Sequence, residues 1–336
     1  VYRPTDPVTN AILNVKYMIS KYGDLDDPDF EPVTANEASG LYESKYPLSV
    51  GYMTPDSIYS YWGTSANPFE NLNEYVLCAT NEQCKSVFRQ AGTFETAGNN
   101  ATVTGDGYGN YQAQVQNTDE TSNAYLTFAA DTTQKYYLFV DASAAESITV
   151  EKSQRGDIED IDEDYSGIEN IGVVHEGETL SVDITFEAGG GGDFTAYLYR
   201  LDQAEWDRAY ALLSADMLSV TEYGDTHLKG TIDAGNGGVM MTSIPYDKGW
   251  KLCVDGRERD TSCLVGDAMI SVQLGGGKHD IEMKFTPQGF QAGLIITILS
   301  VLLLIADRRL YGRRHFRRRS AAPASDEPVD DSIDVI

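Results

Sequence analysis

GFQAGLIITILSVLLLIA, residues Gly289–Ala306, runs for 18 residues without a charged side chain. As a helix this run would span about 27 Å, close to the thickness of a bilayer's hydrocarbon core. A buried core helix would have a shorter apolar run and a polar face, whereas the polar interruptions here are Gln291, Thr297 and Ser300. The run therefore predicts a transmembrane helix embedded in a lipid bilayer.

The residues after this run predict its orientation. Seven arginines follow within 13 positions: Arg308, Arg309, Arg313, Arg314, Arg317, Arg318 and Arg319. Basic residues that flank a membrane span stay on the cytoplasmic side, so we expect residues 1–288 to be extracytoplasmic and the tail 307–336 to be cytoplasmic. A tail-anchored protein would need the opposite orientation. A cell-wall sorting signal would need a different pentapeptide from Phe285–Gly289, and the acidic tail Ser320–Ile336 looks disordered.

The first residues of the chain have no export signal. Val1 is not a start methionine, and residues 1–30 lack the basic-then-apolar pattern of a signal peptide. Because the arginines after the apolar run predict that residues 1–288 lie outside the cytoplasm, we expect an upstream membrane segment that carries them across. The chain is then expected to be the C-terminal part of a larger, polytopic membrane protein.

The charge of the chain is strongly negative. Before the apolar run there are 46 acidic and 18 basic residues, which gives a net charge of −28. Such a surface repels nucleic acid and anionic lipid headgroups, so we expect no nucleic-acid partner. Cationic ligands and a general acidic bias of the source organism remain open as explanations.

The four cysteines form two close pairs, Cys78/Cys84 and Cys253/Cys263. This even count and local spacing predict two small disulfide loops in an oxidising compartment, with free buried thiols as the alternative. A zinc site would prefer tighter spacing and further ligands nearby. A Cys78–Cys84 bond requires the helix around Cys78 to end between the two residues, and Asn81 could supply that break.

The pattern along the chain predicts a mainly β protein with short helices, an α+β class. We expect two consecutive sandwich-like or jelly-roll-like domains after a small α/β segment, and then one transmembrane helix. Within the first segment, Asn67-Pro68 predicts the start of a helix that runs to about Cys78, and a further short helix is expected over about residues 81–90. The predicted boundaries are 1–91 for the α/β segment, 92–201 for a β-sandwich, 202–216 for a connecting helix, 217–288 for a membrane-proximal β domain, 289–306 for the membrane helix and 307–336 for the tail.

No familiar catalytic or metal motif is present. The four histidines are scattered, and the chain lacks a P-loop, a G-x-S-x-G elbow and H-E-x-x-H. The acidic block Asp157–Asp164 fails as an EF-hand because Tyr165 and Ile171 occupy the glycine and glutamate positions. We therefore expect a solvated acidic loop there, with an irregular calcium site as the alternative, and we expect no cofactor and no metal in this chain.

Aromatic residues suggest a saccharide site, because a flat ring can stack on the apolar face of a pyranose. Tyr59, Tyr61 and Trp62 cluster in one predicted loop, and Trp250 begins a predicted strand. The chain has 21 tyrosines, so packing or chance clustering is the competing interpretation. These four residues remain candidates for sugar stacking.

Three stretches resemble one family. The run Ser243–Gly256 (SIPYDKGWKLCVDG), then Gly277–Ile281 (GKHDI), then Thr286–Phe290 (TPQGF) looks like the C-terminal end of the YfhO family of bacterial membrane proteins. Asn10–Ile19 and Asn67–Asn73 resemble earlier extracytoplasmic segments of that family. The order and spacing of these stretches make the resemblance fairly specific, and together they span most of the chain.

The resemblance implies a function in the bacterial cell envelope. The resemblance implies a polytopic membrane protein that is similar to the GT-C type of glycosyltransferase. Such an enzyme transfers a sugar from a polyprenyl-phosphate carrier to an envelope polymer such as teichoic acid. In such enzymes the catalytic acid lies in an early outer loop, so no catalytic residue is carried over to this chain. The resemblance therefore implies that this region supports the site or binds the acceptor; the alternative is a membrane-anchored, non-catalytic surface protein that binds carbohydrate or protein.

Overall fold

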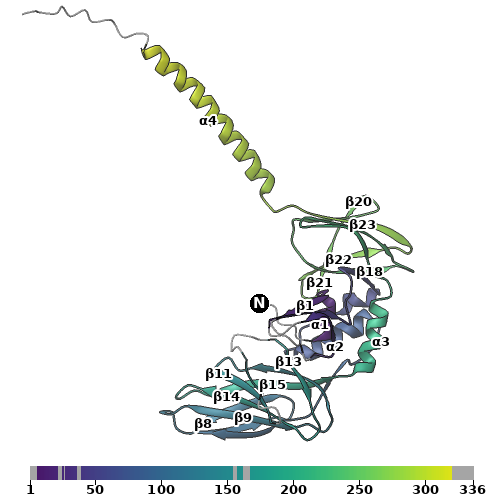
Figure 1. The fold of residues 1–336 in the computed structure, drawn as a ribbon, viewed down its shortest axis with the longest axis vertical. Helices are drawn as coiled ribbons and strands as arrows, with labels where there is room; N and C mark the ends of the chain where they lie inside the picture. Colours follow the sequence, from purple (N-terminus) through teal and green to yellow (C-terminus); the bar gives the residue numbers. More distant parts are fainter. Residues whose placement is uncertain are drawn as a thin grey trace, which may run out of the picture. The chain divides into compact units, whose positions relative to one another are not determined.

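The computed structural model describes residues 6–21, 25, 27–35, 39–153, 157–161 and 167–319; the side chains of 157–160 and 310–319 are not described. It divides into two compact units, Val1–Lys284 and Phe285–Ile336. The first unit is built mostly from antiparallel β-sheets with short helices, and the second contains one long helix (Figure 1). The mainly β fold class with one apolar C-terminal helix is therefore confirmed.

The N-terminal segment combines helices with a small sheet. Its elements are α1 (Pro7–Ile12), β1 (Tyr17–Ser20), β2 (Phe30–Ala35), β3 (Gly40–Ser44), β4 (Gly51–Thr54), the 3-10 helix η1 (Asp56–Ser60) and α2 (Pro68–Ala79). The order β1-β3-β2 forms a three-stranded sheet. The Asn67 side chain caps α2 by accepting from the backbone N–H of Phe69 at 3.0 Å, as its position before Pro68 predicts.

Two sheets form a β-sandwich. One has the order β13 (Glu169–Val174), β10 (Gln134–Asp141), β15 (Gly192–Leu201), β8 (Asn110–Val115) and β7 (Ala101–Gly105), and β5 (Phe88–Gln90) also pairs with β15. The other has the order β12 (Asp157–Ile161), β11 (Ser147–Lys152), β14 (Thr179–Phe186), β9 (Ser122–Ala129) and β6 (Glu95–Asn99). Their facing sides share a core of alternate apolar residues that includes Leu126, Leu138 and Val182.

A second β domain follows α3 (Gln203–Leu213). One of its sheets has the order β16 (Ser219–Gly224), β17 (His227–Asp233), β23 (Lys278–Phe285), β19 (Trp250–Val254) and β20 (Arg257–Arg259). The other has the order β21 (Ser262–Leu264), β22 (Met269–Leu274), β18 (Gly238–Pro245) and β4. Strand β4 comes from the N-terminal segment, so distant parts of the chain complete one sheet.

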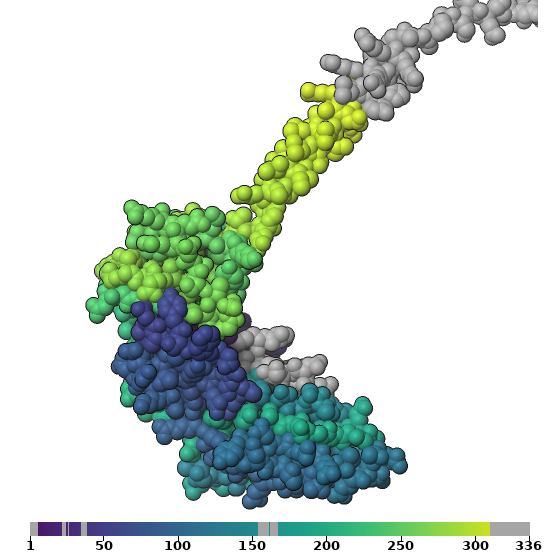
Figure 2. Space-filling model, turned by 180° about the vertical axis from the view of Figure 1, so that it is seen from behind, coloured from purple at the N-terminus to yellow at the C-terminus, as the bar shows by residue number. Residues whose placement is uncertain are grey.

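A third hydrophobic core joins these parts. It contains Ile58 and Val76 from the N-terminal segment, Tyr137 from the sandwich, Trp206 from α3 and Met241 from β18. Figure 2 shows the N-terminal segment, in purple and blue, between the teal sandwich and the green second β domain. The N-terminal segment is therefore the packing layer between the two β domains.

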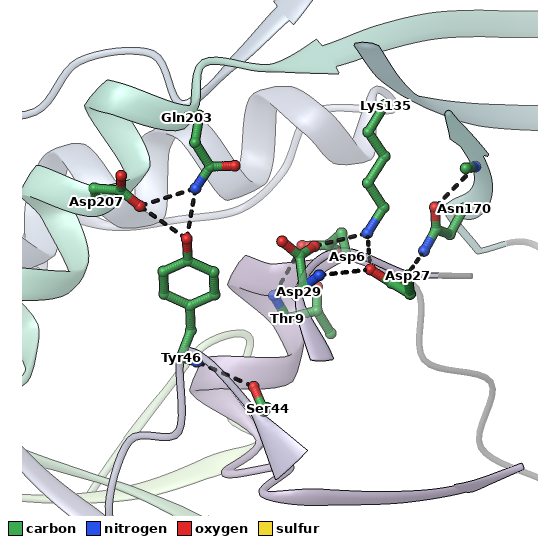
Figure 3. A network of polar contacts seen from close by, with 11 residues as sticks. Asp6, Thr9, Asp27, Asp29, Ser44, Tyr46, Lys135, Asn170, Gln203 and Asp207 are labelled. Carbon is green, nitrogen blue, oxygen red and sulfur yellow. Dashed lines mark hydrogen bonds and ion pairs between the residues drawn. The ribbon is translucent and has the colours of Figure 1, made fainter. Parts of the chain in front are cut away.

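A buried ionic cluster also attaches the N-terminal segment to the sandwich (Figure 3). The Lys135 ammonium lies 2.6 Å from Asp27 Oδ1 and 2.6 Å from Asp29 Oδ2, with these side chains only 8–10% exposed. Asn170 donates a hydrogen bond to the second oxygen of Asp27 at 2.8 Å. Burial raises the pKa of Asp29 although Lys135 opposes that rise. One cation thus holds two carboxylates where water is largely excluded.

The long helix α4 (Phe290–Arg319) contains the predicted membrane span. Its part Phe290–Arg309 is long and apolar enough to cross a membrane. The helix continues past the predicted end at Ala306 because arginine is a good helix former and Asp307–Arg319 contains no proline. The tail residues 320–336 lie outside the described part of the chain.

Two predictions about local structure were wrong. No helix forms over residues 81–90: Asn81 and Glu82 adopt positive φ angles of 51° and 61°, and β5 begins at Phe88. Part of the acidic block, Asp157–Ile161, is strand β12 rather than loop, while residues 162–166 lie outside the described residues. At Asn81 and Glu82 the left-handed backbone stops any further helix, whereas at Asp157–Ile161 the pairing with β11 overrides the local polar composition.

Candidate functional site

A groove with a volume of about 700 Å³ lies between the N-terminal segment and the second β domain. We call it the Trp250 groove. Its walls come from four places in the sequence: residues 14–16, residues 47–50, the hairpin of β16 and β17, and residues 243–250. Its size falls within the range of small-molecule pockets. The lining is mainly apolar, with polar groups among the lining residues Asn14, Lys16, Ser49, Asp225, His227 and Ser243.

The turn before β19 positions Trp250. The Asp247 side chain accepts a hydrogen bond from the Gly249 N–H at 2.6 Å, and the Asp247 carbonyl accepts from the Trp250 N–H at 3.0 Å. The indole is half-buried, because it packs against the core of the second β domain and also lines the groove. An indole held in this way presents a flat apolar surface with little loss of side-chain freedom on binding.

The β16–β17 hairpin forms another wall. Tyr223 is 80% exposed and lines the groove, as does His227. The His227 ring packs directly over Gly224: a Cβ added at Gly224 would lie 2.8 Å from His227 Cε1. His227 Nε2 lies 3.9 Å from Glu222 Oε2, which Lys229 also approaches at 3.1 Å. Glycine at position 224 therefore leaves room for the imidazole beside the hairpin backbone.

Backbone contacts tie the loop before β4 to the second β domain. Ser49 donates its hydroxyl to the Leu218 carbonyl at 2.6 Å, and the Leu218 N–H donates to Gly51 O at 2.8 Å. The Ser243 N–H donates to Val50 O at 3.0 Å. These bonds close one side of the groove, so its shape depends on the docking of the N-terminal segment.

The charges of the groove favour binding over acid–base chemistry. Lys16 is paired with Glu43 at 3.7 Å. Among the described residues that line the groove, Asp225 alone carries a carboxylate. A pair of carboxylates, which glycosidic chemistry commonly requires, is therefore not assembled there. An aromatic face with scattered hydrogen-bonding groups instead suits the apolar and hydroxylated sides of a sugar.

The other predicted aromatic residues do not join this groove. Tyr61 packs edge-on against Tyr75 with ring centroids 5.4 Å apart, so it is structural. Tyr59 donates to Gln273 Oε1 at 3.2 Å. Trp62 is 73% exposed, and the Glu74 carboxylate holds its loop by accepting from the Gly63 N–H at 3.0 Å. Trp62 thus presents a largely exposed indole that does not line the Trp250 groove.

The structure does not confirm the predicted disulfides, because all four cysteines are free thiols. Helix α2 does end between Cys78 and Cys84, but the Cys84 sulfur instead accepts a hydrogen bond from Arg208 Nε at 3.4 Å. Cys253 and Cys263 lie on β19 and β21, which belong to different sheets. Residues that are close in sequence are thus separated by the sheet arrangement.

Two of the quoted sequence motifs meet in the second β domain. The Asp255 carboxylate lies 2.8 Å from His279 Nδ1 and accepts from the Asp280 N–H at 2.9 Å. This hydrogen bond raises the pKa of His279 and lowers the pKa of Asp255. Asp255 adopts a φ of 53° at the turn before Gly256. The pair therefore fastens a hairpin turn to β23 and has a structural role.

The sequence identified Trp250 but not its neighbours in the groove. No local sequence motif marks Tyr223, His227 or Lys16 as part of a site. They line the same groove as Trp250 only after β4 pairs with β18 and the N-terminal segment docks. Among the described residues, no group of three or more His, Cys, Asp or Glu side chains could hold a metal ion. The groove is therefore a candidate for ligand binding by aromatic and polar contacts.

Solved structures show distant similarities. A family 35 carbohydrate binding module from Clostridium thermocellum has 16% identity, with 34% of this chain and 95% of that chain covered and a TM-score of 0.22. The α-L-rhamnosidase of Streptomyces avermitilis has 9% identity, with 76% of this chain and 27% of that chain covered and a TM-score of 0.23. These scores are too low to define a shared fold. No curated protein matches the sequence significantly.

The family comparison covers most of the chain. The model of the family described as bacterial membrane protein YfhO matches residues 2–297, which include all three hydrophobic cores and the beginning of the apolar helix. The resemblance of the sequence motifs around Trp250, His279 and Gly289 is thereby confirmed. The chain belongs to the YfhO family of bacterial membrane proteins.

Proposed function

We propose that this chain is the C-terminal extracytoplasmic region and last membrane helix of a polytopic glycosyltransferase of the GT-C type. In this proposal the enzyme takes a sugar from a polyprenyl-phosphate carrier and transfers it to a cell-envelope polymer. The Trp250 groove binds the acceptor polymer. The observation that carries the proposal is the indole of Trp250, half-buried in a groove of about 700 Å³, in a chain of this membrane-protein family.

The orientation in this proposal rests on charge. Seven arginines follow the apolar part of α4, and they favour a cytoplasmic C-terminus. Residues 1–284, which form the unit that contains the groove, then face the compartment where a lipid-linked sugar is transferred to the envelope. The groove needs only to hold the acceptor, because the carboxylate that drives sugar transfer is assigned to another part of the parent protein.

The groove suits one or two sugar units of a polymer. Trp250 and Tyr223 offer aromatic faces for the C–H side of a pyranose, while Asn14, Ser49 and Asp225 offer hydrogen bonds to hydroxyl groups. Lys16 and His227 add donors that accommodate an acidic linkage in the polymer, such as a phosphodiester. A groove open to solvent allows the chain of the polymer to continue on both sides.

A gene deletion tests the enzymatic part of this proposal. Envelope polymers from the wild-type and the deletion strain would be purified and their sugar substituents identified by mass spectrometry. We expect one sugar to be lost from one polymer and restored by the wild-type gene. Unchanged glycosylation of every polymer would refute the transferase function and would leave a membrane-anchored surface protein as the alternative.

A further inference from the structure

The outer face of the sandwich sheet β13-β10-β15-β8-β7 is divided into two halves. Along β10, Tyr137 and Phe139 are buried in the core that joins the N-terminal segment, whereas Asp141 on the same face is exposed. Along β15, Tyr199 and Tyr197 are buried in that core, and the face ends in Thr195 and Asp193. One half of the face is therefore covered, and the other half is left to the solvent.

Strand register brings polar side chains together on the uncovered half. Asp141 lies opposite Thr195, which lies opposite Asn110. Asp193 lies opposite Gln112, which lies opposite Thr104. These six residues line a hollow with a volume of about 630 Å³. Side chains from four neighbouring strands thus converge on one surface that no part of the described chain covers.

The hollow offers both ordered and unused hydrogen-bonding groups. Gln112 donates to Asp193 Oδ1 at 2.9 Å, which fixes both side chains across the strands. Asp141, Thr104 and Thr195 make no side-chain hydrogen bond to any other described residue. A ligand with several hydroxyl groups can therefore donate to the carboxylates and accept from the hydroxyls without breaking the Gln112–Asp193 pair.

The loop between β7 and β8 borders the hollow and supplies Asp106 and Asn110 to it. Asp106 holds this loop by accepting from the Tyr108 N–H at 2.7 Å and from Asn110 Nδ2 at 2.6 Å. Gly109, with a φ of 112°, sits directly on the Tyr197 ring, where an added Cβ would lie 2.3 Å from it. Tyr108 is left 76% exposed between the two lining residues Asp106 and Asn110. The loop that supplies Asp106 and Asn110 to the hollow is thus held in place by these contacts.

The charge of the hollow selects among hydroxyl-rich ligands. Three carboxylates line it, those of Asp106, Asp141 and Asp193, and no lysine, arginine or histidine is among its described lining residues. We propose that this hollow is a saccharide-binding site that accepts uncharged or amino-sugar chains and rejects chains that carry carboxylates or phosphates. The site is separate from the Trp250 groove and does not depend on transferase activity.

Isothermal titration calorimetry on the full chain in lipid nanodiscs tests whether this site binds saccharides. The probes are three hexasaccharides of different charge: N-acetylated chitohexaose, the deacetylated amino-sugar hexamer and hexagalacturonate. We expect the first two to bind and hexagalacturonate to bind at least about tenfold more weakly, because carboxylates face carboxylates in the hollow. Binding of neither uncharged nor amino sugars, or equal binding of hexagalacturonate, would overturn the proposal.

Substitutions inside and outside the hollow test whether chitohexaose binds there. Gln112→Ala and Asp141→Asn should each weaken chitohexaose binding by about three- to tenfold, the usual effect of a lost hydrogen bond. Gln114→Ala is the matched control, because Gln114 is exposed two residues further along β8 and does not line the hollow. Trp250→Ala should leave this binding unchanged, which separates the hollow from the groove. Equal losses in Gln114→Ala, or loss only in Trp250→Ala, would contradict the assignment.

Discussion

The Trp250 groove and the hollow on the sandwich differ in how they are built. The groove is mainly apolar and needs segments that are more than 200 residues apart in sequence, from Asn14 to Trp250. The hollow is polar and uses neighbouring strands of one sheet. The groove therefore depends on the docking of the N-terminal segment, whereas the hollow depends only on the integrity of the sandwich.

The largest expected loss of stability follows a substitution in the buried ionic cluster of Lys135, Asp27 and Asp29. Lys135→Met would leave Asp27 and Asp29 buried without their cation, and breaking a buried pair in this way costs about 3–5 kcal/mol. We expect a large fall in the free energy of unfolding, measured with urea. Below the unfolding transition, binding in the groove should weaken more than binding in the hollow.

Two comparisons check the cause of that effect. Lys45→Met is the control, because Lys45 is exposed and lies 3.9 Å from Glu31, where a pair contributes little. Adding Asp27→Asn and Asp29→Asn to Lys135→Met should recover part of the stability, because no unpaired charge remains. A stability loss for Lys135→Met no larger than for Lys45→Met would show that the cluster is not the attachment we describe.

A smaller effect is expected at the hairpin wall of the groove. Gly224→Ala places a Cβ 2.8 Å from His227 Cε1, so the ring must move from its position in the groove. We expect acceptor binding in the groove to weaken by about threefold, and chitohexaose binding in the hollow to remain unchanged. Gly275→Ala, where an added Cβ meets nothing within 4 Å, is the control. An unchanged groove affinity would mean that His227 does not contact the ligand.

The smallest effect concerns pH. Because the folded state raises the pKa of His279, the Asp255–His279 pair stabilises the protein fully below the unfolded histidine pKa of about 6.5, and this stabilisation is lost as pH rises through the raised value. The stabilisation from Asp255 changes in a different pH range. Because the folded state lowers the pKa of Asp255, this stabilisation is lost as the pH falls through the lowered value. The difference in Tm between wild type and His279→Gln should therefore be larger at pH about 6 than at pH about 9.

The control for this pH effect is His175→Gln. The ion pairs of the described residues join His227 and His279 to carboxylates but include none of His175, so its substitution removes a histidine without removing such a pair. A Tm difference for His279→Gln that is constant with pH would show that the pair does not titrate as proposed. His279→Gln should leave ligand binding at both sites unchanged, because the pair lies in neither the groove nor the hollow.

Local patterns predicted much of this fold. Strands Ser147–Lys152, Thr179–Phe186 and Lys278–Phe285 appear where alternating apolar and polar residues predict them. Strands β6 (ETAGN) and β7 (ATVTG) were not predicted, and their pairing with β9 and β8 supplies what local propensity does not.

The two sites were much harder to predict than the strands. The aromatic character of Trp250 suggested a sugar contact, but its partners come from elements that meet only in the folded chain. The polar residues of the hollow look like ordinary exposed strand positions until the register aligns Asp141, Thr195 and Asn110. Neither the long-range pairing of β4 with β18 nor the alignment of β8, β15 and β10 is encoded in a local motif.

Binding of the acceptor polymer tests whether the Trp250 groove is the acceptor site. The polymer would be isolated from the deletion strain, so that it lacks the transferred sugar, and titrated into the full chain in nanodiscs. Trp250→Ala should weaken binding by about tenfold or more, as expected for a buried aromatic contact, whereas Trp62→Ala, which removes an exposed indole outside the groove, should not. Equal affinities for wild type and Trp250→Ala would contradict the assignment of the groove as the acceptor site.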